Sequence, residues 1–286
     1  MHEPVLLQEV LKALAPQKGD SYLDATAGYG GHSGAILELT QNYHASVLVD
    51  RDKMAIDHLR TQFASKEISI IQSDFFSAAE LLVREGRQFD IILADLGVSS
   101  PHLDKASRGF SFQHSGPLDM RMDQRQTLTA ETIVNEWAVE QLEDILRTYG
   151  EEPHARRIAE NIVAHRPFKT TDELANVIAR ASGKWQKKHP ATRTFQALRI
   201  AVNNELGLLE STLPLWIQLL KPGGRLGIIS FHSLEDRIVK NYFAEHGGSG
   251  YDAIFSVPYK NPIVASDQEL ASNPRARSAK LRVAAK

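Results

Sequence analysis

The sequence contains no cysteine. This absence excludes a disulfide scaffold, a zinc–thiolate site, an iron–sulfur cluster and a cysteine nucleophile, so any catalysis must use histidine, carboxylate, hydroxyl or backbone groups. No stretch has ~18 apolar residues in a row, and the acidic N-terminus lacks a basic region followed by an apolar core. We therefore expect a cytoplasmic protein with no membrane segment.

An excess of charge of one sign is also absent. The 286 residues include 33 Lys and Arg against 35 Asp and Glu, for a net charge of −2, and 42% of them are hydrophobic. These values are ordinary for a globular protein and exclude a disordered, collagen-like or coiled-coil chain. Size alone allows one large domain or two smaller ones.

Several well-known catalytic and nucleotide-binding motifs are missing. The Gly-x-Gly-x-x-Gly fingerprint of dinucleotide sites does not occur, and the Gly-Lys pair at 183–184 is followed by Trp185, so there is no Walker motif. Ser230, His232 and Glu235 lie close together in the sequence, yet no Gly-x-Ser-x-Gly elbow is present. These gaps disfavour a nicotinamide enzyme, a phosphate-loop NTPase and a hydrolase.

The first hundred residues alternate short apolar runs with segments of helical periodicity. Apolar residues from Leu6 to Leu14 predict an amphipathic opening helix that Pro16 and Gly19 end. Strands that alternate with helices form right-handed βαβ units, so we expect a parallel sheet covered on both faces. Strands are predicted at 21–24, 45–50, 68–71 and 89–96, with helices through 36–39 and over 54–63.

The alternation stops after the fourth predicted strand and returns near the C-terminus. A polar stretch and several helical segments occupy the middle of the chain, and a helix at 208–220 and strands at 225–230 and 280–283 follow. This order predicts one Rossmann-like α/β domain, residues 1–103 and 207–286, interrupted by an inserted all-helical domain, residues 104–206.

Positive charge is concentrated in that insertion. The stretch 153–199 has ten basic and three acidic residues, a net charge of +7 in a chain whose total is −2. A basic insertion on an acidic body suggests a polyanion partner such as nucleic acid. The alternative is that these Lys and Arg side chains only cover solvated helix faces.

A glycine-rich turn follows the first predicted strand, in the sequence Asp24-Ala-Thr-Ala-Gly28-Tyr-Gly30-Gly31. Glycines at a strand-to-helix turn let the backbone approach a ligand, which predicts a nucleotide-like cofactor. Asp50 ends the next strand about 20 residues later, where an acid can hold ribose hydroxyls. The leading Asp24 favours S-adenosylmethionine, which carries an ammonium group to neutralise and has no pyrophosphate.

The next two strand ends supply further candidates at the same edge of the sheet. Phe76, after the third strand, could stack on adenine or belong to the core. Asp95 ends the fourth strand and leads into a Gly, Ser and Pro turn, so we expect it to border both the cofactor and the acceptor. The alternative is that Asp95 only forms the turn and caps a helix.

Several long motifs closely resemble the bacterial 16S rRNA (cytosine-N(4)-)-methyltransferases, the RsmH or MraW family. The resemblance covers effectively the whole chain. The motifs are Asp24-Ala-Thr-Ala-Gly-Tyr-Gly-Gly-His-Ser33, Asp95-Leu-Gly-Val-Ser-Ser-Pro101, Arg108-Gly-Phe-Ser-Phe112, Gly116-Pro-Leu-Asp-Met-Arg-Met-Asp123, Tyr149-Gly-Glu-Glu152, His189-Pro-Ala-Thr-Arg-Thr-Phe-Gln-Ala-Leu-Arg199 and Ser230-Phe-His-Ser-Leu-Glu-Asp-Arg237.

The resemblance implies a class I S-adenosylmethionine-dependent methyltransferase whose inserted helical domain helps to bind RNA. Its substrate would be the exocyclic amine of a cytidine in the decoding centre of 16S rRNA, within the small ribosomal subunit. The implied cofactor contacts are Gly30, Gly31, His32, Asp50 for the ribose, Phe76 beside the adenine, Asp95 and His102. His102 stands where the family usually has Gln, although His can also donate a hydrogen bond.

Direct methyl transfer to an amine needs a group that positions the nitrogen and accepts a hydrogen bond from it. We expect Asp95 to be this group. The Asp-Pro-Pro-Tyr type of motif is absent, so stacking of a flipped base would fall to Phe110, Phe112 or His232. We expect no catalytic metal and no obligate protein partner.

The helix-like stretch at 189–199 carries four polar side chains at spacings of four, three and three. We expect its RNA-directed face to present His189, Arg193, Gln196 and Arg199, with His232 also near the RNA. The alternative is a structural ion-pair face. At the level of the whole protein, a nicotinamide or flavin oxidoreductase and a non-catalytic RNA-binding protein are the competing hypotheses.

Overall fold

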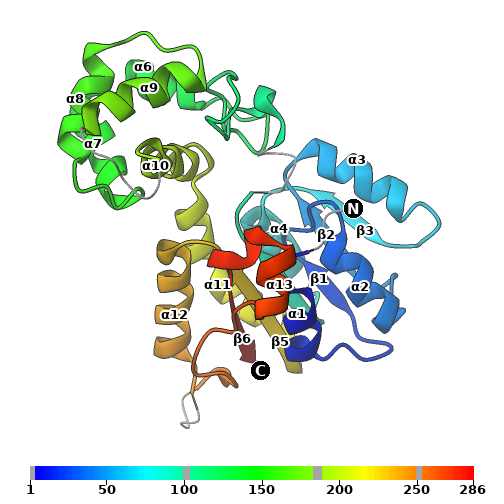
Figure 1. Ribbon diagram of the computed structural model, residues 1–286. Coiled ribbons are helices and arrows are strands. Elements are labelled where there is room, and N and C mark those ends of the chain that lie inside the picture. Colours follow the sequence, from blue (N-terminus) through cyan, green and yellow to red (C-terminus); the bar gives the residue numbers. More distant parts are fainter. Residues whose placement is uncertain (1–3, 99–103, 183–188, 249–252) are drawn as a thin grey trace. The chain divides into compact units, whose positions relative to one another are not determined.

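A computed structural model describes residues 4–98, 104–182, 189–248 and 253–286 of the chain (Figure 1). The chain divides into two compact units. The sheet unit contains residues 1–97 and 206–286, and the inserted unit contains residues 98–205. The sequence pattern places the limits of the insertion at 104 and 206, so the inserted unit begins a few residues earlier, close behind the fourth strand.

The sheet unit alternates strands and helices in the expected order. Its first part consists of α1 (Leu7–Leu14), β1 (Tyr22–Asp24), α2 (Gly31–Thr40), β2 (Val47–Asp50), α3 (Lys53–Gln62), β3 (Ser69–Gln72), α4 (Phe75–Arg84) and β4 (Phe89–Asp95). After the insertion come α11 (Glu205–Leu219), β5 (Leu220–Ser230), α12 (Ser233–His246), α13 (Asp267–Ser272), the 3₁₀ helix η2 (Pro274–Ser278) and β6 (Lys280–Ala285).

The six strands form one sheet in the order β3-β2-β1-β4-β5-β6. The first five strands run parallel to their neighbours, with Leu23 opposite Val47 on β2 and Ile92 on β4. The last strand, whose direction was not predicted, pairs antiparallel with β5, whereas the parallel arrangement expected for the first hundred residues is confirmed. An apolar run predicts a strand but not its direction, which depends on where the preceding segment brings the chain back to the sheet.

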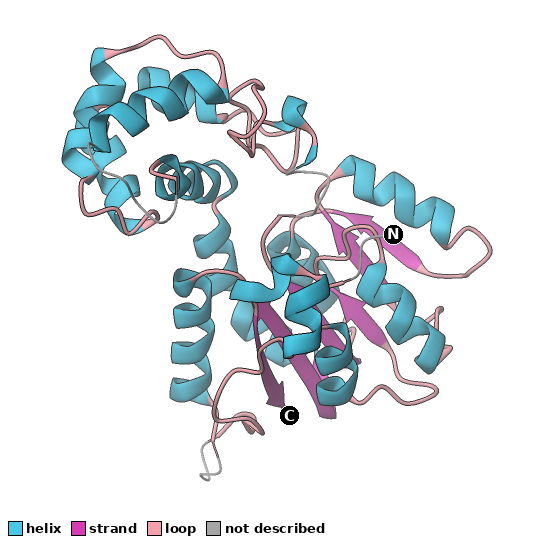
Figure 2. Cartoon of the chain, viewed as in Figure 1, coloured by secondary structure: helices cyan, strands magenta, loops and turns pink. Residues whose placement is uncertain are grey.

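Helices cover both faces of the sheet (Figure 2). One core packs the sheet against α4, α11 and α12, and includes Leu23, Ile92 and Trp216. The other packs the opposite face against α1, α2 and α3, and includes Tyr22, Ile91 and Leu281. Neighbouring residues such as Tyr22 and Leu23 enter different cores because successive side chains of a strand point to opposite faces.

The inserted unit is helical in the part that the structure describes, apart from one isolated bridge between Pro117 and Thr170. Its core gathers apolar residues of the α-helices that are described in this unit, among them Ile133, Leu142 and Leu198. The elements are η1 (Ala106–Arg108), α6 (Ala130–Glu136), α7 (Val139–Thr148), α8 (Ala155–Ala164), α9 (Thr171–Ser182) and α10 (Ala191–Asn203). In the described ranges of both units, no helix is long and apolar enough to cross a membrane.

Candidate functional site

The carboxyl ends of three adjacent strands bring three aspartates to one edge of the sheet. Asp24 ends β1, Asp50 ends β2 and Asp95 ends β4. The chain fills the sheet first on one side of β1, with β2 and β3, and then on the other side with β4. Such a reversal of strand order opens a crevice at the carboxyl edge, where open α/β sheets bind their ligands.

The turn between β1 and α2 requires glycine for two separate reasons. Gly30 precedes the first residue of α2 with φ +76°, and a Cβ there would lie 2.5 Å from Oε1 of Gln62. Gly31 has ordinary dihedrals, but a Cβ would lie 2.6 Å from Cγ of Pro4. The bare backbone therefore allows close packing here and leaves the N-terminus of α2 at the carboxyl edge of the sheet.

Asp50 is tied to this turn by its side chain. Its Oδ2 accepts a hydrogen bond from the Gly28 backbone at 2.8 Å, and its Oδ1 accepts one from the Asp52 backbone at 2.8 Å. The carboxylate is half-buried and held from two directions. Each carboxylate oxygen has a further lone pair, so the group can still accept hydrogen bonds from vicinal hydroxyls of a ribose.

Asp24 has an internal structural role. Its side chain is 2% exposed, and Oδ2 accepts hydrogen bonds from the Tyr22 hydroxyl at 2.7 Å and the Ser33 hydroxyl at 2.5 Å. Oδ1 accepts one from the Thr26 backbone. Burial raises the pKa of Asp24. This carboxyl therefore joins β1 to α2 inside the protein, and its role toward the ammonium of a cofactor stays a prediction.

Asp95 has a different environment from the other two aspartates. Its backbone N–H donates to the Thr26 hydroxyl at 2.6 Å, whereas its buried Oδ1 makes no hydrogen bond with any residue that the structure describes. The side chain is 27% exposed. Burial raises the pKa of Asp95 well above its usual range, and the carboxyls of Asp24 and Glu235 raise it further.

His32 lies beside Asp95 but faces inward. Its ring is 6% exposed, with Nε2 2.9 Å from the Val5 carbonyl and Nδ1 3.6 Å from Oδ2 of Asp95. Burial lowers the pKa of His32 to about 4, against the opposing effect of the Val5 hydrogen bond. The imidazole is therefore neutral near pH 7, and its Nε2 donates to Val5. It fixes the first turn of α2 next to the candidate site.

Phe76 and His102 are the remaining expected cofactor contacts. Phe76 lies in the first turn of α4, half-buried against the core, next to Asp74, which caps this helix by accepting from the Ser77 backbone. The packing of Phe76 on the core is thus observed, and its contact with adenine stays a prediction. His102 lies outside the described residues.

The expected RNA-directed face of the insertion consists partly of internal contacts. Arg199 forms a bidentate pair with Glu205, and Gln196 donates to the Tyr149 carbonyl. His189 precedes α10 and stacks on Phe112 at 4.6 Å between ring centroids. For these residues the structural alternative accounts for the observed contacts. Helical spacing placed them on one face, but that face packs against its own unit.

Arg193 and His189 are the exposed members of this set. The Arg193 side chain is 51% exposed, and its guanidinium lies 4.0 Å from the Glu152 carboxylate. The two stacking candidates of the insertion are less accessible: Phe110 is 7% exposed in the core, and Phe112 packs on Phe195 as well as on the imidazole before α10. Arg193 and His189 are therefore the polar side chains that this set exposes, and their contact with RNA stays a prediction.

His232 belongs to the sheet unit, where it begins α12. Its Nδ1 accepts from the Glu235 backbone at 3.4 Å, while a Glu235 carboxylate oxygen accepts from the backbones of Phe231 and His232. The imidazole is 10% exposed. It thus acts as a helix cap in a reciprocal capping box, a role for which the sequence Ser230-Phe-His-Ser-Leu-Glu was a signal.

Two contributors to the site were missed by the sequence analysis. Thr26 orients the end of β4 through its hydroxyl, and Glu235 places a second negative charge near Asp95 from α12. Thr26 stands two residues after the predicted first strand, within the glycine-rich turn, so its position in the sequence could have marked it as a site residue. Glu235 is 140 positions from Asp95 along the chain and gave none.

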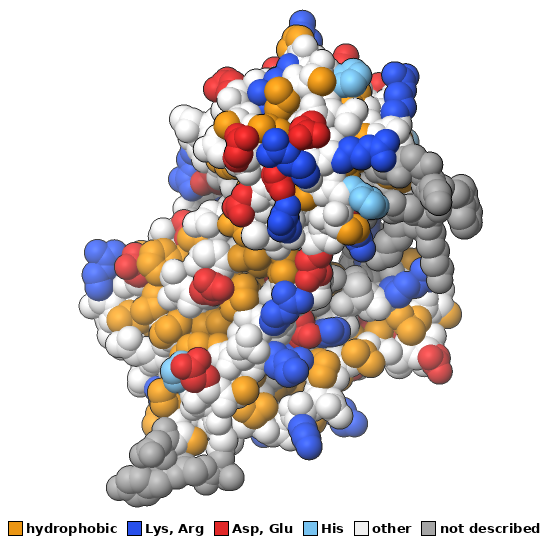
Figure 3. Space-filling view, turned by 90° about the vertical axis from the view of Figure 1, so that its left-hand side faces the viewer, with side chains coloured by type: hydrophobic (Ala, Val, Ile, Leu, Met, Phe, Trp, Pro, Cys, Tyr) orange, Lys and Arg blue, Asp and Glu red, His pale blue; other side chains and the backbone are white. Residues whose placement is uncertain are grey.

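Ion pairs reduce the positive charge of the insertion. Arg156 pairs with Glu143 and Glu160, and Arg147 also pairs with Glu143. Some of these acidic partners lie just outside the 153–199 stretch, so its formal charge of +7 overstates the local field. Acidic and basic side chains are interspersed on the face drawn in Figure 3. Within the described residues, the exposed Arg157, Lys169 and Arg180 have no acidic partner within 4 Å.

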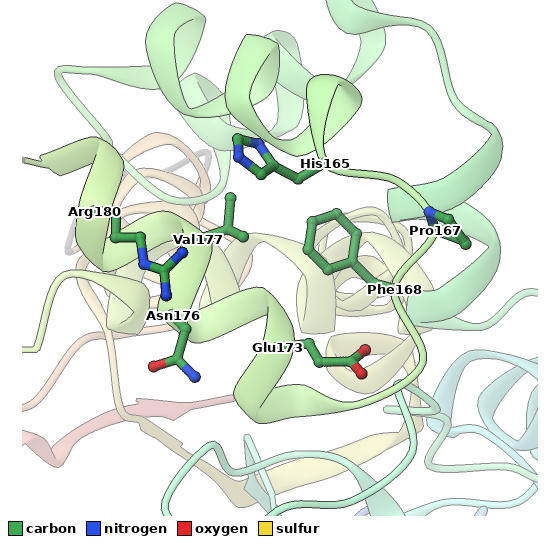
Figure 4. Close-up of a pocket in the computed structure, with 7 residues that line it drawn as sticks. All are labelled: His165, Pro167, Phe168, Glu173, Asn176, Val177 and Arg180. Atoms are coloured by element: carbon green, nitrogen blue, oxygen red, sulfur yellow. The ribbon is translucent and has the colours of Figure 1, made fainter.

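A shallow pocket of about 320 Å³ lies in the inserted unit between the end of α8 and the outer face of α9 (Figure 4). His165 and Arg180 lie at one end of it, and Phe168 and Glu173 at the other. Glu173 accepts hydrogen bonds from the backbones of Lys169 and Thr170, so its carboxylate is already used to begin α9. This pocket is separate from the site at the sheet edge.

Comparison with known proteins connects this geometry to a family. The profile of the MraW methylase family matches residues 1–286. The chain is 50% identical over 287 residues to "Ribosomal RNA small subunit methyltransferase H" of Cyanothece sp., covering 99% of this chain and 94% of that one. It is 48% identical to the protein of the same name from Acidobacterium capsulatum, over 100% and 98% of the two chains.

Solved structures are more distant. A putative methyltransferase from Streptococcus mutans, in complex with SAH, has a TM-score of 0.48 and 11% identity, over 100% of this chain and 99% of that one. The assignment rests on the sequence matches instead. Because a family profile matches from end to end and relatives are about half identical over nearly their whole length, the chain belongs to the MraW methylase family, whose methyl donor is S-adenosylmethionine.

Proposed function

We propose that the protein methylates the exocyclic N4 amine of a cytidine in the decoding centre of 16S rRNA, within the small ribosomal subunit. The observation that carries the proposal is the Asp95 carboxyl beside a glycine turn, whose Oδ1 has no hydrogen bond among the described residues, in a chain whose curated relatives are named as small-subunit rRNA methyltransferases. A carboxyl at this place suits an amine acceptor, because it can accept a hydrogen bond from the attacking nitrogen.

The residues at the sheet edge would hold S-adenosylmethionine with its adenine toward β3 and its methionine end toward β4. Asp50 would accept hydrogen bonds from the ribose hydroxyls, and Phe76, one strand further out, would lie beside the adenine. Gly30, Gly31 and His32 would line the path toward β4, where Asp95 meets the methionine end. When bound, the cofactor supplies an electrophilic methyl group on a sulfonium.

Asp95 would position the cytosine amine for direct in-line transfer. The lone pair of this amine is delocalised into the ring, so a hydrogen bond from N–H to the carboxylate helps the nitrogen to pyramidalise toward the methyl group. The proton leaves the nitrogen after the new bond has formed. No covalent enzyme intermediate is needed.

RNA binding would use exposed cations of the insertion. Arg193 on α10 is one candidate from the sequence, and Arg157, Lys169 and Arg180 on or between α8 and α9 are further candidates because no acid pairs with them in the described structure. The modest charge of the chain predicts that an assembled subunit is a better substrate than protein-free rRNA.

The deciding experiment is methyl transfer from labelled S-adenosylmethionine to small subunits that lack the modification, followed by nucleoside analysis. We expect labelled N(4)-methylcytidine with the native protein and its loss in Asp95→Ala, provided that this variant still binds cofactor. Asp57→Ala, an exposed aspartate of α3 paired with Lys53, is the matched control and should retain activity. Label on another atom would refute the assignment, and subunit binding without incorporation would favour an RNA-binding protein without activity.

A further inference from the structure

The side chain of Asp95 lies among groups that do not stabilise its negative charge. The titratable groups that face it in the described structure are Asp24 and Tyr22 from β1, His32 from α2 and Glu235 from α12. Two of these are acids, and no Lys or Arg is among them. Buried Oδ1 has no hydrogen-bond donor among the described residues. A carboxylate in this place would be poorly solvated and would repel its neighbours.

The neighbouring histidine also favours a protonated carboxyl. Because Nε2 of His32 donates to the Val5 carbonyl at 2.9 Å, Nδ1 of the neutral ring presents a lone pair. That lone pair faces Oδ2 of Asp95 at 3.6 Å. At this separation the neutral ring gives Asp95 neither a positive charge nor a hydrogen bond that would stabilise the carboxylate. Burial lowers the pKa of His32 and raises that of Asp95, so the proton belongs to the carboxyl.

The orientation of the cofactor brings positive charge to this carboxyl. With the ribose at Asp50 on β2 and the adenine beside Phe76 after β3, the methionine end extends over β1 toward β4. Asp95 ends β4 and is 27% exposed there. The donor form of the cofactor carries a positive sulfonium in that region, whereas the product form, S-adenosylhomocysteine, has a neutral thioether.

We propose that Asp95 is a charge-compensating group that holds a proton in the free enzyme and in the product complex and releases it when the sulfonium form of the cofactor binds. The carboxyl would thereby distinguish donor from product by charge. This inference rests on the proposed cofactor site, but it does not depend on which nucleoside is methylated.

The methyl transfer returns a proton to the Asp95 carboxylate. In the donor complex the Asp95 carboxylate accepts a hydrogen bond from the acceptor N–H. The nitrogen lone pair forms the new C–N bond, the S–C bond breaks with its electron pair remaining on sulfur, and the N–H proton moves to Asp95. The products are a neutral methylated amine, a neutral thioether and a protonated carboxyl, which is the state that the free enzyme prefers.

The test is to measure the affinities of the full chain for S-adenosylmethionine and S-adenosylhomocysteine by calorimetry between about pH 5 and pH 7. The α-amino groups of both ligands titrate above this window and stay protonated within it. Each titration is repeated in buffers of different ionisation enthalpy. The observed binding enthalpy changes with the buffer in proportion to the number of protons released on binding. An analogue with an amine in place of the sulfonium supplies the positive charge without the methyl group.

We expect the affinity ratio of donor to product to rise by up to tenfold per pH unit, until the pH reaches the pKa of Asp95 in the product complex. Donor binding should release up to one proton, product binding none, and the amine analogue should behave like the donor. A ratio that stays constant across the window, with equal proton counts for both ligands, would overturn the inference. Failure of both ligands to bind would overturn the proposed cofactor site as well.

Two variants separate this role from a merely structural one. Asp95→Asn keeps the size of the side chain but cannot ionise, so the ratio should become independent of pH. Asp50→Asn should weaken both ligands by a similar factor and keep the pH dependence of their ratio. Persistence of the pH dependence in Asp95→Asn would assign the proton to another group and refute the proposal.

Discussion

The buried neutral histidine beside the candidate site makes a quantitative prediction about stability and pH. In the unfolded chain a histidine has a pKa of about 6.5, whereas burial lowers that of His32 to about 4. The folded protein therefore binds fewer protons than the unfolded chain between these values. Its stability must fall as the pH drops from about 6.5 to about 4, and this contribution is fully present above pH 6.5.

The size of the effect follows from the two pKa values. Each pKa unit corresponds to about 1.4 kcal/mol, so the interval represents about 3 kcal/mol of unfolding free energy. His32→Gln keeps an amide that can donate to the Val5 carbonyl but has no titrating ring. Between pH 7 and pH 4.5, the difference in unfolding free energy between the native protein and this variant should shift by about 2–3 kcal/mol in favour of the variant.

The assay is urea unfolding followed by tryptophan fluorescence. Trp216 is fully buried in the sheet unit, where it contacts Phe75, so a background with Trp137→Phe and Trp185→Phe reports on that unit alone. His44→Gln changes an exposed histidine of the same unit and should shift the difference by less than about 0.5 kcal/mol. If the unfolding free energies of the native protein and of His32→Gln depend on pH in the same way, the imidazole of His32 is not buried as a neutral ring.

Three further outcomes follow from individual contacts. Asp50→Asn should weaken S-adenosylmethionine binding by about tenfold or more, as measured by calorimetry, and unchanged affinity would exclude the ribose role. Gly30→Ala should lower the unfolding free energy by about 1–3 kcal/mol, because φ is +76° there and the new Cβ would lie 2.5 Å from a side-chain oxygen. Gly86→Ala is the control, with φ +67° and open space around the Cβ, and it should lower the unfolding free energy by less in the same urea experiment. Asp236→Asn removes the charged partner of Arg282, a side chain that is 12% exposed, and should lower the unfolding free energy by about 3 kcal/mol. A decrease below about 0.5 kcal/mol would show that this ion pair does not hold α12 to β6.

Most of the sheet unit could be predicted because its signals are local. The apolar runs of β2 and β4 have the length and composition of buried strands, and the turn at Gly28–Gly31 follows directly after β1. Strand ends in such a fold lie on a common edge, so residue positions along the chain were enough to bring Asp50 and Asp95 to one edge of the sheet. The family motifs, being long and contiguous, were likewise visible in the sequence.

The use of each polar side chain was decided by tertiary structure. Helical spacing correctly put Gln196 and Arg199 near one face, but only packing showed that the Tyr149 carbonyl and the Glu205 carboxylate occupy them. Asp24 likewise stands at the expected edge but turns inward to two hydroxyls. Sequence periodicity tells which residues share a face and says nothing about what that face meets.

The chemistry of Asp95 depends most strongly on long-range structure. The sequence by itself determined that a carboxyl ends the fourth strand of a methyltransferase-like sheet. The tertiary structure alone brought Glu235 near it from α12, set the His32 lone pair 3.6 Å away and left Oδ1 without a donor in the described structure. Since electrostatic energies depend on distance and burial, and not on separation along the chain, the protonation of this group is a property of the fold.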